Sequence, residues 1–299
     1  MRSSSVALDE YVDGVPPESS VVVRTLGGFE FSAGGHEIDR WRAGKARVLF
    51  QFMLLNRGRV LSRETLYEAL WPDTGWSGNS SSLKVAVHML RAALVSQLQH
   101  ACEHPDADGG RPSLQLVTHQ LGYVLKTEGV WVDFEVFDDL IDRGRAADAR
   151  GDGVEAARLF AAAMDVHRGD FLPGVDLDWA EVHRMWLRSR ALLALERLVK
   201  THLAAGDHLA VLDRCREMLA IEPLREETYR ILMAVHGHLG HLSQVQRWYG
   251  ICSTRLRREL KVGLDESTVR LHGRAIRGEL VEAGFDLATV LPRRVPVGI

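Results

Sequence analysis

The sequence predicts a mostly helical chain with a small β component, divided into two domains. Residues 21–131 show short strand patterns, then three helical patterns and a final pair of strands. Residues 132–284 show helical periodicity only, and one pattern within them returns after 34 residues. With 299 residues, 46% of them apolar, the chain is long enough to bury two cores. The flanking residues 1–20 and 285–299 are expected to be a disordered N-terminal segment and a C-terminal tail.

The first domain begins with strands and continues with helices. Residues 21–39, VVVRTLGGFEFSAGGHEID, form short β-type runs broken at paired glycines. Helical periodicity then runs over residues 43–56, and Gly58 is suited to end that helix. Ser62 is suited to cap the next helix, SRETLYEALW, with Glu64 in its first turn. After a third helix, LQLVTHQLGYVLKT predicts two strands joined by a turn.

The third helix, NSSSLKVAVHMLRAAL at residues 79–94, carries two parallel stripes. Its apolar stripe repeats at helical spacing and is predicted to be buried: Leu83, Val87, Leu90 and Leu94. Lys84, His88 and Arg91 form a second stripe one position further on, and no acidic residue lies in this stretch. Surface helices usually mix both signs of charge, so a stripe of donors favours an anionic partner. An ordinary solvated face is the alternative.

Charge is unevenly distributed along the chain. The formal net charge is −3, and residues 1–20, with one Arg and four acidic residues, contribute −3. Residues 21–131 hold 12 Lys and Arg against 10 acidic residues, and residues 132–299 hold 24 against 26. The region with the three helices is therefore the only basic one, and only mildly so, which is compatible with a nucleic-acid partner.

The cysteines and the apolar runs indicate the cellular compartment. Cys102, Cys215 and Cys252 are widely spaced and odd in number, which fits a reducing cytoplasm and no disulfide framework. The first 20 residues lack the apolar run of a signal peptide. The longest nearly apolar run, at residues 48–55, is far shorter than the ~18 residues that a membrane span needs. We therefore expect a soluble cytoplasmic protein without a membrane partner.

No motif supports catalysis, a cofactor or a metal site. Gly44-Lys45 lacks the rest of a phosphate-binding loop. GDGVEA at Gly151 joins two helices instead of following a strand, and GWSGN at Gly75 lacks the last glycine of a nucleophile elbow. Possible metal ligands crowd residues 100–108, with His100, Cys102, His104, Asp106 and Asp108, and three histidines crowd residues 236–241. Surface positions that happen to hold them explain this more simply than converging ligands. The prediction is no enzyme activity, no cofactor and no metal.

The second domain is predicted to be built from helix pairs. Its helical segments lie near residues 134–150, 153–167, 180–205, 208–221, 225–239, 242–259 and 265–284. LAAGDHLAVLDRC and HGHLGHLSQVQRWY align Gly206 with Gly240, and their separation of 34 is the tetratricopeptide period. ARGDGVEAARLF around Gly151 looks like an earlier copy. The pattern favours a tetratricopeptide-like domain, whose usual work is binding.

Three helices followed by a β-hairpin is the layout of a winged helix-turn-helix, whose third helix enters the major groove. The first domain, residues 21–131, resembles the OmpR-type winged helix. The residues that carry this match are Gly58, Val60, Ser62, Leu66, Trp71, Leu90, Arg91, Leu94, Gly122 and Tyr123. With the helical block of residues 132–284, the chain resembles the SARP family, transcriptional activators of actinomycete secondary metabolism that carry a bacterial transcriptional activation domain. VDFEVFDDLIDRG, RGDFLPG and LREETYRILM are the family-like phrases of that block.

The winged layout predicts a role for each donor. Base edges in the major groove are expected to meet Lys84, His88, Ser81, Ser82 and Val85. Phosphates are expected to meet Arg91, Arg57, Arg59 and Lys45, although a solvated turn is the alternative for Arg57 and Arg59. His119 and Gln120, at the hairpin turn, could reach the minor groove or the backbone.

The resemblance also implies partners. Two copies would bind tandem direct repeats of promoter DNA near the −35 element and contact the σ factor and RNA polymerase. The predicted function is therefore a sequence-specific DNA-binding transcriptional activator of an antibiotic biosynthesis cluster, located on the nucleoid. The alternative is a repeat-type protein-interaction or ligand-sensing protein whose winged domain docks on protein.

Overall fold

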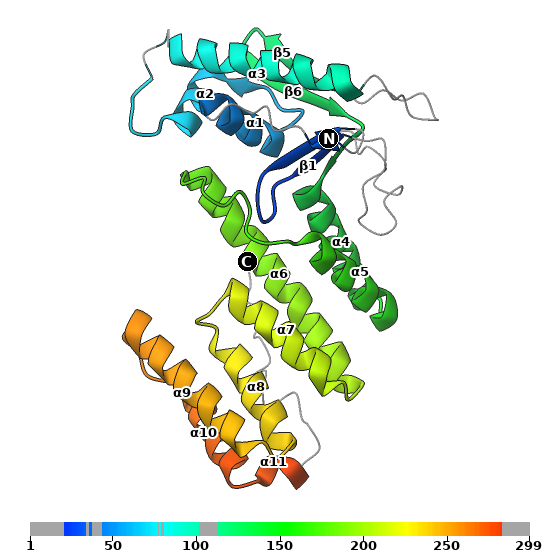
Figure 1. Cartoon of the computed structure of the whole chain (residues 1–299), viewed down its shortest axis with the longest axis vertical. Coiled ribbons are helices and arrows are strands. Elements are labelled where there is room, and N and C mark those ends of the chain that lie inside the picture. The colour runs from blue at the N-terminus through cyan, green and yellow to red at the C-terminus, as the bar shows by residue number, and fades with distance from the viewer. Residues whose placement is uncertain are drawn as a thin grey trace. The chain divides into compact units, whose positions relative to one another are not determined.

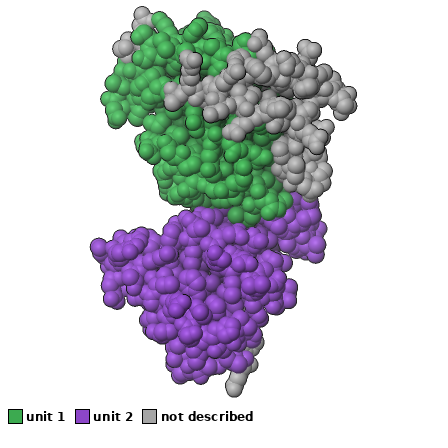
Figure 2. All heavy atoms as spheres, viewed as in Figure 1, with its two compact units in different colours: residues 1–143, 162–190 green, residues 144–161, 191–299 purple. Residues whose placement is uncertain are grey.

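The computed structural model describes residues 21–33, 36–37, 44–76, 78, 81–101 and 113–282. None of the helices in these ranges is both long and apolar enough to span a membrane. The chain divides into two compact units, residues 1–143 with 162–190 and residues 144–161 with 191–299 (Figure 2). The fold class is as predicted, a winged helix-turn-helix with a small β component and a helical block.

Two small sheets belong to the first unit. One has the order β3-β2-β1-β7, made of β1 (Val21–Arg24), β2 (Glu30–Ala33), β3 (His36–Glu37) and β7 (Val130–Val132). Its hairpin pairs β1 antiparallel to β2, whereas β7 runs parallel to β1 with Val22 opposite Trp131. The other has the order β4-β6-β5, made of β4 (Leu61–Ser62), β5 (Ser113–His119) and β6 (Gly122–Glu128). The strand β7 was not predicted.

Three helices complete the winged helix: α1 (Lys45–Leu55), α2 (Arg63–Leu70) and α3 (Ser81–Ala101). In Figure 1, α3 lies along α1 and α2 with the β5–β6 hairpin beside it. Ser62 caps α2 as predicted, because its hydroxyl accepts the N–H of Thr65 at 3.0 Å. The predicted apolar stripe is buried throughout, with exposed fractions of 2% for Leu83 and 0% for Leu90. This buried stripe fixes which face of α3 is turned outward.

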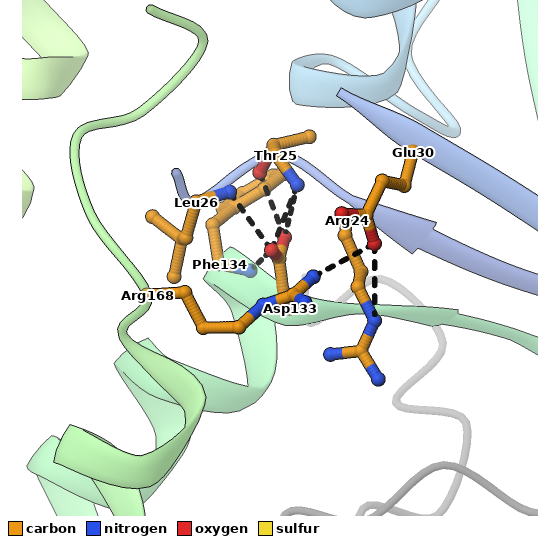
Figure 3. Close-up of polar contacts among 7 residues, drawn as sticks. All are labelled: Arg24, Thr25, Leu26, Glu30, Asp133, Phe134 and Arg168. Atoms are coloured by element: carbon orange, nitrogen blue, oxygen red, sulfur yellow. Dashed lines mark hydrogen bonds and ion pairs between the residues drawn. The ribbon is translucent and has the colours of Figure 1, made fainter. Parts of the chain in front are cut away.

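The start of α4 (Asp133–Ala149) is bonded to the turn between β1 and β2 (Figure 3). The buried carboxylate of Asp133 accepts the main-chain N–H groups of Thr25 and Leu26 and the hydroxyl of Thr25, at 2.7 to 2.8 Å. It also accepts the N–H of Phe134 at 2.8 Å. Burial raises the pKa of Asp133, and these hydrogen bonds act in the opposite direction.

The RGDFLPG loop, residues 168–174, lies against the same turn. The N–H of Gly27 donates to the main-chain oxygen of Asp170 and that of Leu172 donates to the oxygen of Thr25, both at 2.8 Å. Gly27 has φ +85, and a Cβ there would lie 2.8 Å from the oxygen of Arg168. Only glycine fits so close an approach. The turn is therefore held from two sides, by α4 and by this loop.

The second unit consists of helices from the predicted block. Its parts are the helices α7 (His208–Ile221), α8 (Glu226–His238), α9 (Leu242–Glu259), α10 (Glu266–Ile276) and α11 (Glu279–Glu282), with segments of α4, α5 (Gly153–Val166) and α6 (Asp178–Ala204). The single helix predicted over 265–284 is two helices instead. Gly278, with φ +77, ends α10, since a left-handed residue cannot continue a helix.

The 34-residue repeat is visible in hydrogen bonds. Gly206 and Gly240 share φ +72, and their N–H groups donate to the oxygens of Leu203 and Gly237, which also lie 34 residues apart. The next N–H groups donate to His202 and His236, again 34 apart. Gly151 shows the same pair of bonds at the turn between α4 and α5, with φ +80. The predicted copies therefore end their first helix in the same way.

Candidate nucleic-acid interface

The outer face of α3 offers donors and apolar groups but no carboxylate. All of the residues predicted to meet base edges are exposed: Ser81, Ser82, Lys84, Val85 and His88. Val85 is 60% exposed and Met89 beside it is 41% exposed. The whole of α3 lacks Asp and Glu. Such a face can donate to base acceptors and contact thymine methyl groups in a major groove.

Lys45, predicted to meet phosphate, is engaged within the chain. Its ammonium donates to the main-chain oxygen of Leu70 at the end of α2 and lies 5.4 Å from the ring centroid of Trp71. A hollow of about 400 Å³ beside it is lined by Gly44, Lys45, Ala46, Trp71, Ser81, Ser82, Val85, Ala86 and Met89. Lys45 therefore bonds to the carbonyl end of α2, and its contact with phosphate stays a prediction.

Arg57, also predicted to meet phosphate, is paired within the chain as well. Its guanidinium forms an ion pair with Glu135 of α4 and donates to the hydroxyl of Thr127 at 3.3 Å. Thr127 lies near the end of β6 that is far from the hairpin turn. Burial raises the pKa of Glu135 to about 7, although the Arg57 charge opposes that shift. Arg57 thus joins the hairpin to α4, whereas its neighbour Arg59 is exposed.

The hairpin turn is held close to the start of α2. Ser62 pairs with Gly122 and Leu61 with Tyr123, so β4 runs along β6. A Cβ on Gly122 would lie 1.8 Å from the oxygen of Leu61, so only glycine allows this pairing. At the turn itself, His119 and Gln120 are exposed, and Nδ1 of His119 accepts the N–H of Leu121 at 3.2 Å.

Two arginines lie against one ring at this place. Arg91 of α3 donates from Nε to the oxygen of Leu116 at 3.3 Å and from Nη2 to the hydroxyl of Thr118 at 2.6 Å. Its Cζ lies 5.9 Å from the ring centroid of Tyr123, and that of Arg63 lies 5.6 Å from the same centroid. Sequence reasoning missed Arg63, because its place directly after a helix cap does not show that the hairpin lies beside it.

Two segments rich in possible metal ligands, residues 100–108 and 236–241, bear on the predicted absence of a metal site. Residues 102–108 lie outside the described residues. Within the described ranges, no three His, Cys, Asp or Glu residues are arranged to hold an ion. The rings of His236 and His241 lie with centroids 5.8 Å apart, and His238 faces the oxygen of Leu280 at 3.2 Å.

Comparison with known proteins places both regions in described families. Residues 132–277 match the bacterial transcriptional activator domain, and residues 42–102 match the C-terminal domain of transcriptional regulatory proteins. Regulatory protein DnrI of Streptomyces peucetius is 27% identical over 68% of this chain and 72% of its own length. Regulatory protein AfsR of Streptomyces coelicolor is 25% identical over 84% of this chain and 25% of its own length. These two domains and these relatives support a SARP-family assignment.

Other relatives agree with the SARP assignment. Transcriptional regulator RedD of Streptomyces coelicolor is 29% identical over 74% of this chain and 61% of its own length. A structure of Mycobacterium tuberculosis EmbR, in complex with a low affinity phosphopeptide, shares the fold over 87% of this chain and 66% of that one. Its TM-score is 0.65 at 22% identity. The chain spans only about a quarter of the length of AfsR. SARP proteins are transcriptional regulators, a class without enzymatic activity, which agrees with the prediction.

Proposed function

We propose that this SARP chain is a sequence-specific DNA-binding transcriptional activator. The observation that carries the proposal is the acid-free outer face of α3, held beside a hairpin in winged helix-turn-helix order. A face with donors and no carboxylate is not repelled by a polyanion. The two matched domain families, both found in transcriptional regulators, support the same function.

Each exposed group has a proposed partner on the duplex. Lys84 and His88 meet base edges in the major groove, together with the shorter side chains of the first turns, Ser81, Ser82 and Val85. Arg91 and Arg59 meet phosphates. His119 and Gln120, at the hairpin turn, meet the backbone or the minor groove. Residues 21–131 are the proposed DNA-binding domain and residues 132–284 the proposed activation domain.

The proposed partners follow the SARP relatives. Two copies bind tandem direct repeats near a −35 element and recruit RNA polymerase through its σ factor. The regulated genes are an antibiotic biosynthesis cluster, and the protein works on the nucleoid in the cytoplasm.

The proposal is tested by selecting duplexes from a random library with the full chain. We expect enrichment of one sequence motif in two copies, and binding that weakens steeply with salt because phosphate contacts release counterions. A library that shows no enriched motif at low salt after several rounds contradicts the proposal.

A protein-docking function is the alternative. It is favoured by three exposed apolar side chains on one face of α6, Val182 at 68%, Met185 at 59% and Trp186 at 53%. The same selection separates the two functions, because a winged domain that docks on protein enriches no duplex.

A further inference from the structure

We propose that Arg63 and Arg91 together form a seat for one phosphate group of the DNA backbone, with the ring of Tyr123 as its platform. The inference rests on the proposed function and adds Arg63 and Tyr123 to the residues that serve it. It assigns a ligand class, a phosphodiester, to a place where α2, α3 and the hairpin meet.

The ring of Tyr123 is held in place by the neighbouring strands. Tyr123 is only 9% exposed and belongs to β6, where it pairs with Leu61 of β4 and Thr118 of β5. Arg63 is the first residue of α2 and Arg91 lies in the third turn of α3. Both guanidinium carbons lie within 6 Å of the ring centroid, at 5.6 and 5.9 Å. The attraction of a cation for the face of an aromatic ring holds both groups there.

Hydrogen bonds orient the two guanidinium groups without exhausting their donors. Arg63 donates from Nη1 to the oxygen of Gln120 at 3.5 Å, which ties it to the hairpin turn. Arg91 uses Nε and Nη2 on Leu116 and Thr118. A guanidinium carries five N–H donors, so each group retains donors for a further acceptor. Planar guanidinium groups bind phosphate in this way, through two or more parallel N–H bonds.

The seat carries two positive charges. Among the residues that the structure describes, no acidic side chain forms an ion pair with either arginine. Arg57 differs, because it is paired with Glu135. Two cations directed to one ring raise the local positive potential, which attracts an anionic phosphate.

The seat lies where a backbone would pass. Arg91 follows Lys84 and His88 on the outer face of α3, so a duplex with those residues in its major groove has one strand along this rim. Hydrogen bonds to Thr118 and Gln120 hold the two arginines against the hairpin next to its turn. A phosphate held here would fix the register of α3 in the groove.

A methylphosphonate scan tests the seat. In the selected duplex, one backbone phosphate at a time is replaced by a neutral methylphosphonate, and binding by the full chain is measured. We expect one position where the replacement weakens binding of the unmodified chain by about threefold to tenfold. At that position Arg63→Met and Arg91→Met chains should lose no further affinity, because the contact is already gone.

A salt series with matched variants completes the test. Arg63→Met should weaken binding to selected and scrambled duplexes alike and lower the salt slope by about 0.9. Arg63→Lys should keep the slope, because it keeps the positive charge. Arg150→Met, which removes one exposed charge outside the winged helix, is the control. If Arg63→Met binds as Arg150→Met does, the seat does not exist. An unmodified chain that binds no duplex refutes the proposed function itself, which is a distinguishable result.

Discussion

The indole N–H of Trp179 donates to the main-chain oxygen of Ala69 at 3.1 Å, which bonds the first turn of α6 to the last turn of α2. The same indole lies edge-on to Phe52 of α1, with ring centroids 5.3 Å apart. The winged helix and the first part of the helical block share one compact unit, residues 1–143 with 162–190. Their boundary in sequence, near residue 131, is not a boundary in packing.

Replacing Trp179 by Phe is therefore expected to destabilise the protein. The ring keeps most of its packing on Phe52, but the hydrogen bond to Ala69 is lost, at a cost of about 1 kcal/mol. Urea unfolding of the full chain measures the change. Val182→Ala, on an exposed face of the same helix, should change the unfolding free energy by less than about 0.5 kcal/mol. Equal midpoints for the two variants would contradict the role given to Trp179.

Asp133→Asn should be more harmful than the loss of one hydrogen bond. Both carboxylate oxygens accept N–H groups from the turn at Thr25 and Leu26, and an amide would turn its own N–H₂ toward those donors. We expect a loss of about 2–4 kcal/mol of unfolding free energy, since a buried donor is left without an acceptor. Asp139→Asn, in a partly exposed pair with Arg143, is the control. A thermal midpoint as high as that of the control would show that the network is dispensable.

Gly122→Ala tests the pairing that positions the hairpin. The added Cβ would collide with the oxygen of Leu61, so β4 and β6 must separate, at a cost of about 1–3 kcal/mol. We also expect weaker DNA binding, because Tyr123 and the turn shift together. Gly75→Ala, where an added Cβ meets open space, should leave both quantities unchanged. Hydrogen exchange in β6 reports the separation directly, and unchanged protection there would count against it.

Local features of the fold were predictable from the sequence and distant pairings were not. The cap at Ser62, the buried stripe of α3 and the turns at Gly206 and Gly240 depend on residues within about one helical turn. Periodicity shows which face is buried but does not name what covers it. The parallel pairing of β1 with β7 joins residues more than a hundred positions apart, so no local pattern could indicate it.

The residues of the candidate site show the same difference between local features and distant contacts. The exposure of Lys84 and His88 followed from the apolar stripe beside them. The partners of Arg57 and Lys45 did not follow from any sequence pattern. A guanidinium or ammonium group bonds to whichever acceptor the fold brings near. Arg57 bonds to Glu135, 78 residues away, and Lys45 donates to a main-chain oxygen at the end of α2. A basic residue in a turn is therefore weak evidence for a phosphate contact when its tertiary neighbours are unknown.

His183 should make the protein sensitive to acid. It packs against both Phe134 and Phe171, and burial lowers its pKa from 6.5 to about 4. The folded-state pKa is below the unfolded one, so the stability that the neutral ring contributes is present above pH 6.5 and lost as pH falls toward 4. We expect the thermal midpoint of His183→Gln to fall less steeply over that interval than that of the unmodified chain. A variant at an exposed position, His88→Gln, should follow the unmodified chain; parallel curves for all three would contradict the account.

The most direct test of the DNA-binding account is the affinity of Lys84→Ala and His88→Ala chains for the selected duplex and a scrambled one at several salt concentrations. Both side chains lie off the buried stripe of α3, so fold damage is not expected. If they meet base edges, each loss weakens binding to the selected duplex by about 1–3 kcal/mol and changes binding to the scrambled one little. If both affinities stay equal to those of the unmodified chain at every salt concentration, the outer face of α3 is an ordinary solvated surface and the account is wrong.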